Sequence, residues 1–184
     1  MVWSLLSRKR TTNTIRKKAL NQCVKAMPKE WSAIQTGIII TGIENINQLN
    51  QLSHLMADME KEHKKMTALI YVKDLKKANL STPLPEGVFL CQKKDFRARS
   101  VPQSAELNQL LSQSYDWLLD MNFDEDISLF SLSNFSNACF KTGVDTALNM
   151  HLQLSIDLST QSSSQDLYEA GLVMIDQIKK IHLA

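Results

Sequence analysis

Glycine, proline and cysteine are all scarce in this chain of 184 residues. Five glycines and four prolines exclude a collagen-like or low-complexity chain. The three cysteines Cys23, Cys91 and Cys139 stand singly, a pattern that encodes neither a disulfide framework nor a zinc knuckle. No run approaches about 18 consecutive apolar residues, so we expect no membrane-spanning helix. The short apolar stretch at the start precedes the basic cluster, the wrong order for a secretory signal, which favours a cytoplasmic, reducing setting.

Motifs that mark common enzyme sites are also missing. The sequence has no G-x-G-x-x-G, no G-x-x-x-x-G-K-[ST], no G-x-S-x-G and no H-x-x-x-H pair. Asp116 and Asp120 would lie about 13 Å apart on an extended strand and cannot chelate one ion together. The acids Asp124, Glu125 and Asp126 suit the first turn of a helix. We therefore expect no catalytic residue, cofactor or metal, and the sequence favours a non-catalytic protein.

Basic and acidic residues are unevenly distributed along the chain. The formal net charge is +2, yet residues 1–29 contain eight basic residues and no acid, which leaves residues 30–184 with a net charge of −6. A mildly acidic globule with a basic arm fits this pattern better than a uniformly basic nucleic-acid-binding domain. The basic residues of the arm are Arg8, Lys9, Arg10, Arg16, Lys17, Lys18, Lys25 and Lys29.

The basic arm has the periodicity of an amphipathic helix. Ile15, Ala19, Cys23 and Met27 recur every four residues, and Pro28 ends the pattern. Three interpretations stay open: the helix packs on its own domain, lies on an anionic membrane surface, or binds RNA. Under the second and third, residues 1–27 meet the partner and the contacts would come from Arg8, Lys9, Arg10, Arg16, Lys17 and Lys18.

The first half of the body alternates between strand and helix patterns. An apolar run at 33–42 predicts a buried strand, and Ile46, Leu49, Leu52 and Met59 repeat at helical spacing after it. A second strand is predicted at 66–74, so this segment has the order of a βαβ unit with parallel strands. A loop at 75–85, a strand at 87–92 and a polar loop at 93–104 follow.

The second half continues the alternation. The patterns predict a helix at 105–112, a strand at 114–122, and a helix to about Cys139 that begins with a capping box of Asn122 and Glu125. Strands are expected at 140–144 and 152–158. A serine-rich loop at 159–165 then leads to a last amphipathic helix, whose apolar stripe includes Met174, Ile178 and Ile181.

Strands that alternate with helices indicate an α/β fold. We predict a Rossmann-like three-layer sandwich with a mostly parallel sheet, preceded by the basic amphipathic helix. Residues 1–29 would form the helix and residues 30–184 a single domain, since no interdomain linker interrupts them. Neither strand order nor oligomeric state follows from the sequence, and a homodimer stays an open alternative.

Residues 115–144 carry a resemblance to known proteins. An aromatic–Asp pair opens an apolar strand that ends in Asn; a helix and a small–x–aromatic–basic–x–Gly strand follow. The pattern resembles an uncharacterised Bacteroidetes domain-of-unknown-function family of short α/β proteins, and the resemblance extends over nearly the whole chain. The residues that carry it are Tyr115, Asp116, Asn122, Ala138, Phe140, Lys141 and Gly143.

The same stretch is similar, more distantly, to the N-terminal Rossmann-like half of heptosyltransferase-type glycosyltransferases. Those proteins have a comparable Tyr-Asp strand followed by a helix and an aromatic–basic–x–Gly strand. This chain departs from them because it has no second half to supply a nucleotide-sugar site and lacks the early glycine-rich acceptor loop. The resemblance therefore implies the fold and does not imply transferase activity.

Two functions from different classes remain. The first is a cytoplasmic interaction protein that meets an anionic partner through its N-terminal helix, with the inner face of a membrane favoured over RNA. The alternative is a small-ligand or nucleotide-sugar-binding enzyme domain with a site at the carboxyl ends of the strands. In that case Gly42, Asp74 and Asn122 would line the crevice.

Overall fold

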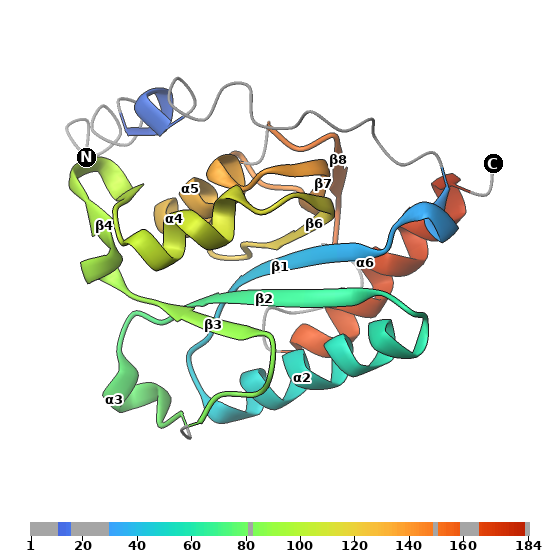
Figure 1. Ribbon diagram of the computed structural model, residues 1–184, viewed down its shortest axis with the longest axis horizontal. Helices are drawn as coiled ribbons and strands as arrows, with labels where there is room; N and C mark the ends of the chain where they lie inside the picture. The colour runs from blue at the N-terminus through green and yellow to red at the C-terminus, as the bar shows by residue number, and fades with distance from the viewer. Residues whose placement is uncertain (1–10, 16–29, 81–82, 149–150, 159–165, 183–184) are drawn as a thin grey trace.

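The computed structural model describes residues 11–15, 30–80, 83–148, 151–158 and 166–182 of the chain (Figure 1). Strands and helices alternate through these ranges, as the sequence patterns predict. The strands are β1 (Thr36–Gly42), β2 (Lys65–Tyr71), β3 (Val88–Cys91), β4 (Phe96–Arg97), β5 (Val101–Pro102), β6 (Tyr115–Met121), β7 (Ala138–Val144) and β8 (Leu154–Ile156). The helices are α2 (Ile46–Lys61), α3 (Leu75–Ala78), α4 (Ala105–Ser112), α5 (Ile127–Phe135) and α6 (Leu167–His182), with 3₁₀ turns η1 (Trp31–Ala33), η2 (Lys93–Asp95) and η3 (Ala98–Ser100).

The central sheet has six strands in the order β3-β2-β1-β6-β7-β8, and every neighbouring pair is parallel. Residues 38–40 of β1 align with 67–69 of β2 on one side and with 118–120 of β6 on the other. This strand order is the one found in doubly wound dinucleotide-binding sheets. The predicted α/β class with a parallel sheet is confirmed; β4 and β5 form a separate antiparallel pair.

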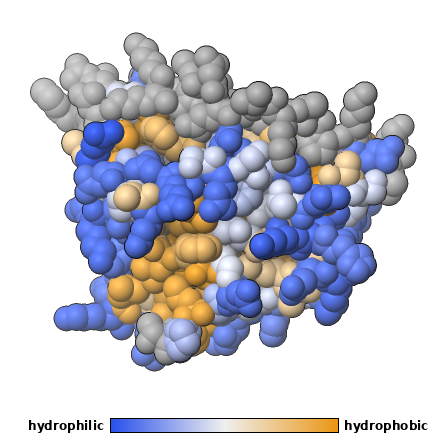
Figure 2. Space-filling model, viewed as in Figure 1, coloured by the Kyte–Doolittle hydropathy of each residue, from blue (hydrophilic) through white to orange (hydrophobic). Residues whose placement is uncertain are grey.

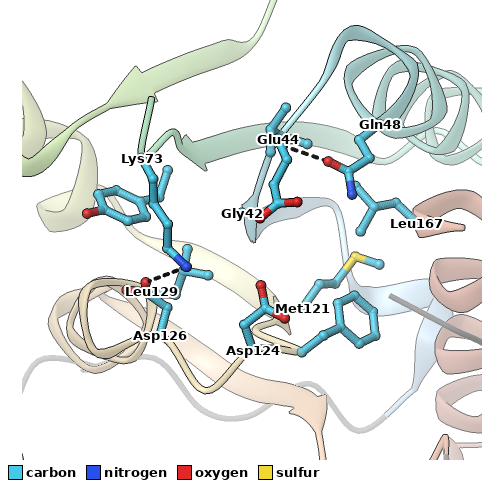
Figure 3. A pocket seen from close by; sticks show the side chains of 12 residues that line it. Gly42, Glu44, Gln48, Lys73, Met121, Asp124, Asp126, Leu129 and Leu167 are labelled. Carbon is cyan, nitrogen blue, oxygen red and sulfur yellow. Dashed lines mark hydrogen bonds and ion pairs between the residues drawn. The ribbon is translucent and has the colours of Figure 1, made fainter. Parts of the chain in front are cut away.

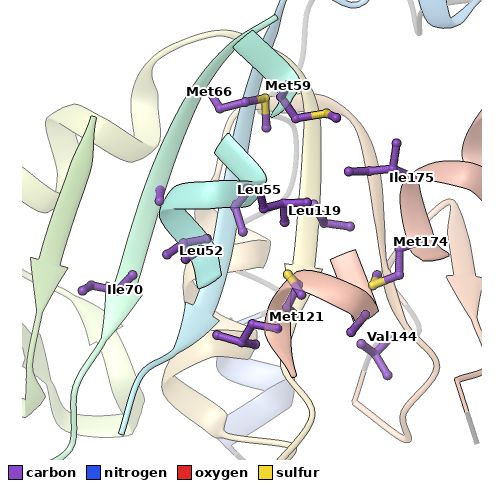
Figure 4. Packing of buried hydrophobic residues seen from close by; sticks show 14 of the residues in the cluster. Leu52, Leu55, Met59, Met66, Ile70, Leu119, Met121, Val144, Met174 and Ile175 are labelled. Carbon is purple, nitrogen blue, oxygen red and sulfur yellow. The ribbon is translucent and has the colours of Figure 1, made fainter. Parts of the chain in front are cut away.

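Helices cover both faces of the sheet, which makes three layers (Figure 1). On one face α2 and α6 pack together on the sheet, with Leu52, Leu55 and Met174 in the larger hydrophobic core (Figure 4). On the other face α4 and α5 bury Leu107, Leu110 and Leu129 in a second core. The strands β1, β2 and β6 lie between these two layers, which explains why the sequences 37–41, 68–72 and 117–121 are nearly continuous apolar runs.

The predicted start and end of the helix after β6 are wrong. Glu125 adopts a left-handed backbone with φ 51° and so lies outside the helix. Asp126 caps α5 by accepting a hydrogen bond from the Ser128 N–H at 2.7 Å, in place of the predicted Asn122/Glu125 capping box. The extended backbone of Ser136 ends the helix, and Cys139 lies in β7.

Two predicted loops contain regular structure. The side chain of Asp74 accepts hydrogen bonds from the N–H groups of Lys76 and Lys77 and starts the four-residue helix α3 within the predicted loop 75–85. The predicted loop 93–104 contains the β4–β5 hairpin. The serine-rich loop 159–165 lies outside the described residues.

The described part of the predicted N-terminal helix is residues 11–15, which are helical. Ile15 is fully buried and packs in a small cluster with Phe130 of α5 and Leu148. This first position of the predicted apolar stripe therefore contacts the chain's own body. The six predicted anion contacts, Arg8, Lys9, Arg10, Arg16, Lys17 and Lys18, lie outside the described residues.

Candidate functional site

A cavity of about 190 Å³ opens at the carboxyl ends of β1, β2 and β6. The chain leaves β1 toward α2 on one face of the sheet and leaves β6 toward α5 on the other face. Adjacent strands whose connections diverge leave a crevice at their carboxyl ends, the usual ligand position in open α/β sheets. The lining residues are Gly42, Ile43, Glu44, Gln48, Tyr71, Lys73, Met121, Phe123, Asp124, Asp126, Leu129 and Leu167.

The cavity carries three carboxylates and one lysine. The Lys73 ammonium lies 3.2 Å from a carboxylate oxygen of Asp126 (Figure 3). Burial opposes the charge of Lys73, but the bond to Asp126 and the charges of Asp126, Asp124 and Glu44 outweigh it and raise the lysine's pKa. Lys73 is therefore a cation held by Asp126, and the four side chains leave the lining with a net formal charge of −2.

Glu44 and Asp124 lie on opposite sides of the cavity in Figure 3, Glu44 after β1 and Asp124 after β6. Both are exposed to solvent. Among the described residues, no ion pair involves either carboxylate. The Glu44 N–H donates to Oε1 of Gln48 at 2.7 Å, a contact that fixes the backbone from which the carboxylate extends. Glu44 and Asp124, which form no ion pair within the described part of the chain, thus face one space.

The inner wall of the cavity is apolar. Ile43, Met121 and Leu129 are almost completely buried, and Leu167 at the start of α6 closes one side. Phe123 is half-buried. The cavity therefore combines buried apolar side chains with a few charged side chains, as small-molecule sites typically do.

The loop 122–126 that carries Asp124 and Asp126 is braced at both ends. Oδ1 of Asn122 accepts from the Asp126 N–H at 2.7 Å, and Nδ2 of Asn122 donates to the Asp126 carbonyl at 2.9 Å. Oε1 of Glu125 accepts from the Ala147 N–H at 3.2 Å, which holds Glu125 in its left-handed conformation. The loop presents its two aspartates in a fixed arrangement.

Of the three residues expected to line the crevice, one lines the cavity and two do not. Gly42 does line the cavity. Asp74 and Asn122 do not: Asp74 caps α3, and Asn122 is fully buried beneath the loop that it braces. The sequence pattern places Asp124 and Asp126 at a helix start and does not indicate Glu44 or Lys73 as lining residues. The signal that was available is their position, since Glu44, Asp124 and Asp126 follow a predicted strand within a few residues and Lys73 lies at the end of one.

A model of a family of unknown function, DUF6913, matches residues 8–169 of the chain. The chain belongs to this family. None of the curated proteins and none of the solved structures compared with it matches significantly. The predicted membership of an uncharacterised α/β family is thereby confirmed, and the match extends over β1 to β8, including both sides of the cavity.

This DUF6913 member also contains a buried polar cluster under α5. Asp120 of β6 is fully buried and accepts a hydrogen bond from the Asn122 N–H at 3.1 Å. Lys141 of β7 donates to the carbonyls of Ser133 and Ser136 at 2.9 and 2.7 Å, at the carboxyl end of α5. Burial raises the pKa of Asp120 to about 7 and lowers the pKa of Lys141 to about 8, while the attraction between the two charges opposes both shifts.

The hydroxyl of Ser133 lies 2.8 Å from Nε2 of His151, whose ring stands edge-on to Phe130. Ser133 and Asp120 are both fully buried, so a substrate has no access to either side chain. A serine near a histidine and an aspartate therefore serves here to join α5, β6 and β7, and we assign it no catalytic role.

The described residues contain no cluster of three or more histidine, cysteine, aspartate or glutamate side chains arranged to hold a metal ion. No helix among them is both long and apolar enough to span a bilayer.

Proposed function

We propose that this DUF6913 protein binds a small organic amine in the cavity at the carboxyl ends of β1, β2 and β6. One observation carries the proposal: Glu44 and Asp124 face the cavity from two neighbouring strands, and the lining's one lysine among the described residues is paired with Asp126. An ammonium group between Glu44 and Asp124 would halve the net negative formal charge of the lining. Its hydrocarbon part would contact Ile43, Met121 and Leu167.

The negative charge of the lining also favours an amine ligand over a nucleotide sugar. A phosphate would approach two carboxylates of the same sign, an arrangement that costs free energy in a partly desolvated site. The cavity volume of about 190 Å³ lies below the roughly 300–1,000 Å³ of most ligand pockets. Both features favour a compact cation over a sugar nucleotide. A relation to heptosyltransferase halves, and the Bacteroidetes origin suggested by the motif pattern, stay predictions from the sequence.

Thermal unfolding of the full chain tests the proposal. Probes are putrescine, choline and glucosamine at millimolar concentration, against glucose 1-phosphate and UDP at matched ionic strength. A bound amine raises the melting temperature, because ligand at about 100 times its Kd stabilises the folded state by about 2.7 kcal/mol. The charge-removing variants Glu44→Gln and Asp124→Asn should lose this shift, whereas Glu60→Gln, on the exposed face of α2, should retain it. A shift that survives in both cavity variants, or its absence with every amine, would overturn the proposal.

A second proposal concerns the basic arm. Residues 1–29 carry eight positive charges and no acid. We propose that they attach the protein to an anionic membrane surface, at the inner face of the cytoplasmic membrane, through electrostatic attraction. Co-sedimentation with anionic and neutral vesicles over a salt series tests this idea with the full chain and with Arg8, Lys9, Arg10, Arg16, Lys17 and Lys18 changed to Gln. Binding to RNA but not to vesicles, or equal pelleting of both proteins, would refute it.

A further inference from the structure

The edge of the sheet at β3 is open and apolar. β3 is the terminal strand of the sheet, and its sequence VFLC contains neither a charge nor a proline. Phe89 is 49% exposed, and Figure 2 shows hydrophobic surface gathered over this edge of the molecule, with hydrophilic residues around it. Native proteins protect exposed strand edges by keeping them short or with charges, prolines or bulges. β3 is short, with four residues, but its sequence carries no charge or proline, so its free backbone groups can pair with another strand.

The backbone hydrogen bonds of β3 identify the residue that is free to pair. The carbonyls of Gly87 and Cys91 accept hydrogen bonds from Ala68 of β2 and from Val72, which directly follows β2. Odd-numbered residues of β3 therefore direct their backbone groups toward β2. Alternate residues of a strand point their groups to opposite sides, so the N–H and C=O of Leu90 face away from the sheet. Near the two ends the available donors are engaged: the Val88 N–H bonds to Pro85 and the Gln92 N–H to Asp95.

We propose that two copies of this chain associate through β3, in antiparallel pairing about a two-fold axis at Leu90. In this register Leu90 exchanges two hydrogen bonds with Leu90 of the other copy, as a hydrogen-bonded pair does in an antiparallel ladder. The two sheets then continue into one sheet of twice as many strands. A two-fold axis makes the interface isologous, so that one short strand is its own partner.

Charge complementarity supports this register. Antiparallel pairing about Leu90 brings the turn before β3 of one copy, which carries Glu86, toward η2 of the other copy, which carries Lys94. Both side chains are exposed. The symmetry repeats the Glu86–Lys94 contact on the other side of the axis, so the interface has two opposite-charge pairs at its rim.

The exposed aromatic ring also finds a partner. Phe89 of the two copies lie on the same face of the joined sheet as diagonal neighbours, about 7–8 Å apart between backbones, within reach of aromatic side chains. An open groove of about 840 Å³ borders this edge and is lined in part by Phe89, Met56 and Leu110. In the second copy, the segment that follows β3 would lie along the groove of the first copy, next to Glu86 of that first copy.

Sedimentation velocity of the full chain over about 1–200 µM, a range that brackets micromolar Kd values, tests the proposal. The wild type should approach twice the mass of one chain. Phe89→Lys should sediment as a monomer, and Glu86→Lys or Lys94→Glu should weaken association by about tenfold or more because like charges then meet across the axis. The double variant Glu86→Lys/Lys94→Glu should restore association, and Asp176→Lys on the exposed face of α6 should not alter it.

Thermal unfolding of each variant checks that it still folds. We expect that it does, because the side chains of Phe89, Glu86 and Lys94 are exposed. A wild type that stays monomeric over this range overturns the proposal and would leave the edge to a strand from another protein. A dimer that persists in Phe89→Lys, or a double charge swap that fails to restore association, also overturns it.

Discussion

Asn122 holds Asp126 at both of its backbone groups, through an acceptor contact of 2.7 Å and a donor contact of 2.9 Å. The sequence suggested Asn122 as a ligand-binding residue at the end of β6. The structure instead gives it a positioning role: it sets the shape of the loop that carries Asp124 and Asp126 into the cavity.

Asn122→Ala should destabilise the protein by about 2–3 kcal/mol, because two hydrogen bonds are lost and the Asp126 N–H and C=O lose a buried partner. Urea unfolding measures the effect. The control is Asn47→Ala on the exposed surface of α2, which should change the free energy of unfolding by less than about 0.5 kcal/mol. Equal stability of the two variants would show that the contacts of Asn122 are not required.

The buried carboxyl of Asp120 should make stability depend on pH. Its pKa is raised to about 7 by burial, from an ordinary value of 3.8 in the unfolded chain. Between these values the folded state keeps a proton that the unfolded state has released, so the free energy of unfolding falls as the pH rises, by up to about 1.4 kcal/mol per pH unit. Urea unfolding at several pH values should give a flatter profile for Asp120→Asn. A profile identical to that of the wild type would contradict the assignment.

Lys141 should stabilise the folded state both through its positive charge and as a hydrogen-bond donor. Lys141→Met removes the bonds to the carbonyls of Ser133 and Ser136 and leaves Asp120 without its cation. We expect a loss of about 3 kcal/mol at neutral pH. In a double-mutant cycle, Asp120→Asn/Lys141→Met should lose less than the sum of the single variants, since each single change leaves the other group uncompensated. Additive losses would indicate that the two side chains act independently.

Substitution by alanine should lower the stability of the protein at one glycine and not at another. A Cβ on Gly143 would lie 2.6 Å from the carbonyl oxygen of Asp120 and 2.7 Å from its Cβ, contacts that require the backbone of β6 or β7 to move. We expect Gly143→Ala to cost about 2–3 kcal/mol. Gly42→Ala is the matched comparison, because its Cβ would meet Leu129 at an ordinary 3.5 Å. Thermal melts should show a clear loss for the first and nearly none for the second.

Much of the fold could be predicted from local pattern. The runs around Ile39, Ile70 and Leu118 gave the buried strands, and helix-length crossovers between them required parallel pairing. The helix at 105–112 was predicted with its observed bounds because Ser104 supplies its cap and three leucines its buried face. The start of α5 was mistaken because Glu125 takes a left-handed conformation that depends on its contact with Ala147, a residue in another loop.

The candidate site was harder to predict, because its residues become neighbours only in the folded sheet. Gly42 was identified from its place at the end of a strand. Glu44 and Asp124 lie eighty residues apart in the sequence. They line the same cavity because β1 pairs with β6 in a register that sets Thr41 beside Met121. No local pattern encodes that pairing.

The sequence by itself determined the α/β class, the identity of most buried strands and helices, and the concentration of positive charge in residues 1–29. These properties follow from periodicity and composition, which act over a few residues. Tertiary structure decided the strand order, the acidic cavity, the burial of Asp120 beside Lys141 and the open edge at β3. Each of these depends on which strands become neighbours, and that choice is made by the packing of the whole sheet between its two layers of helices.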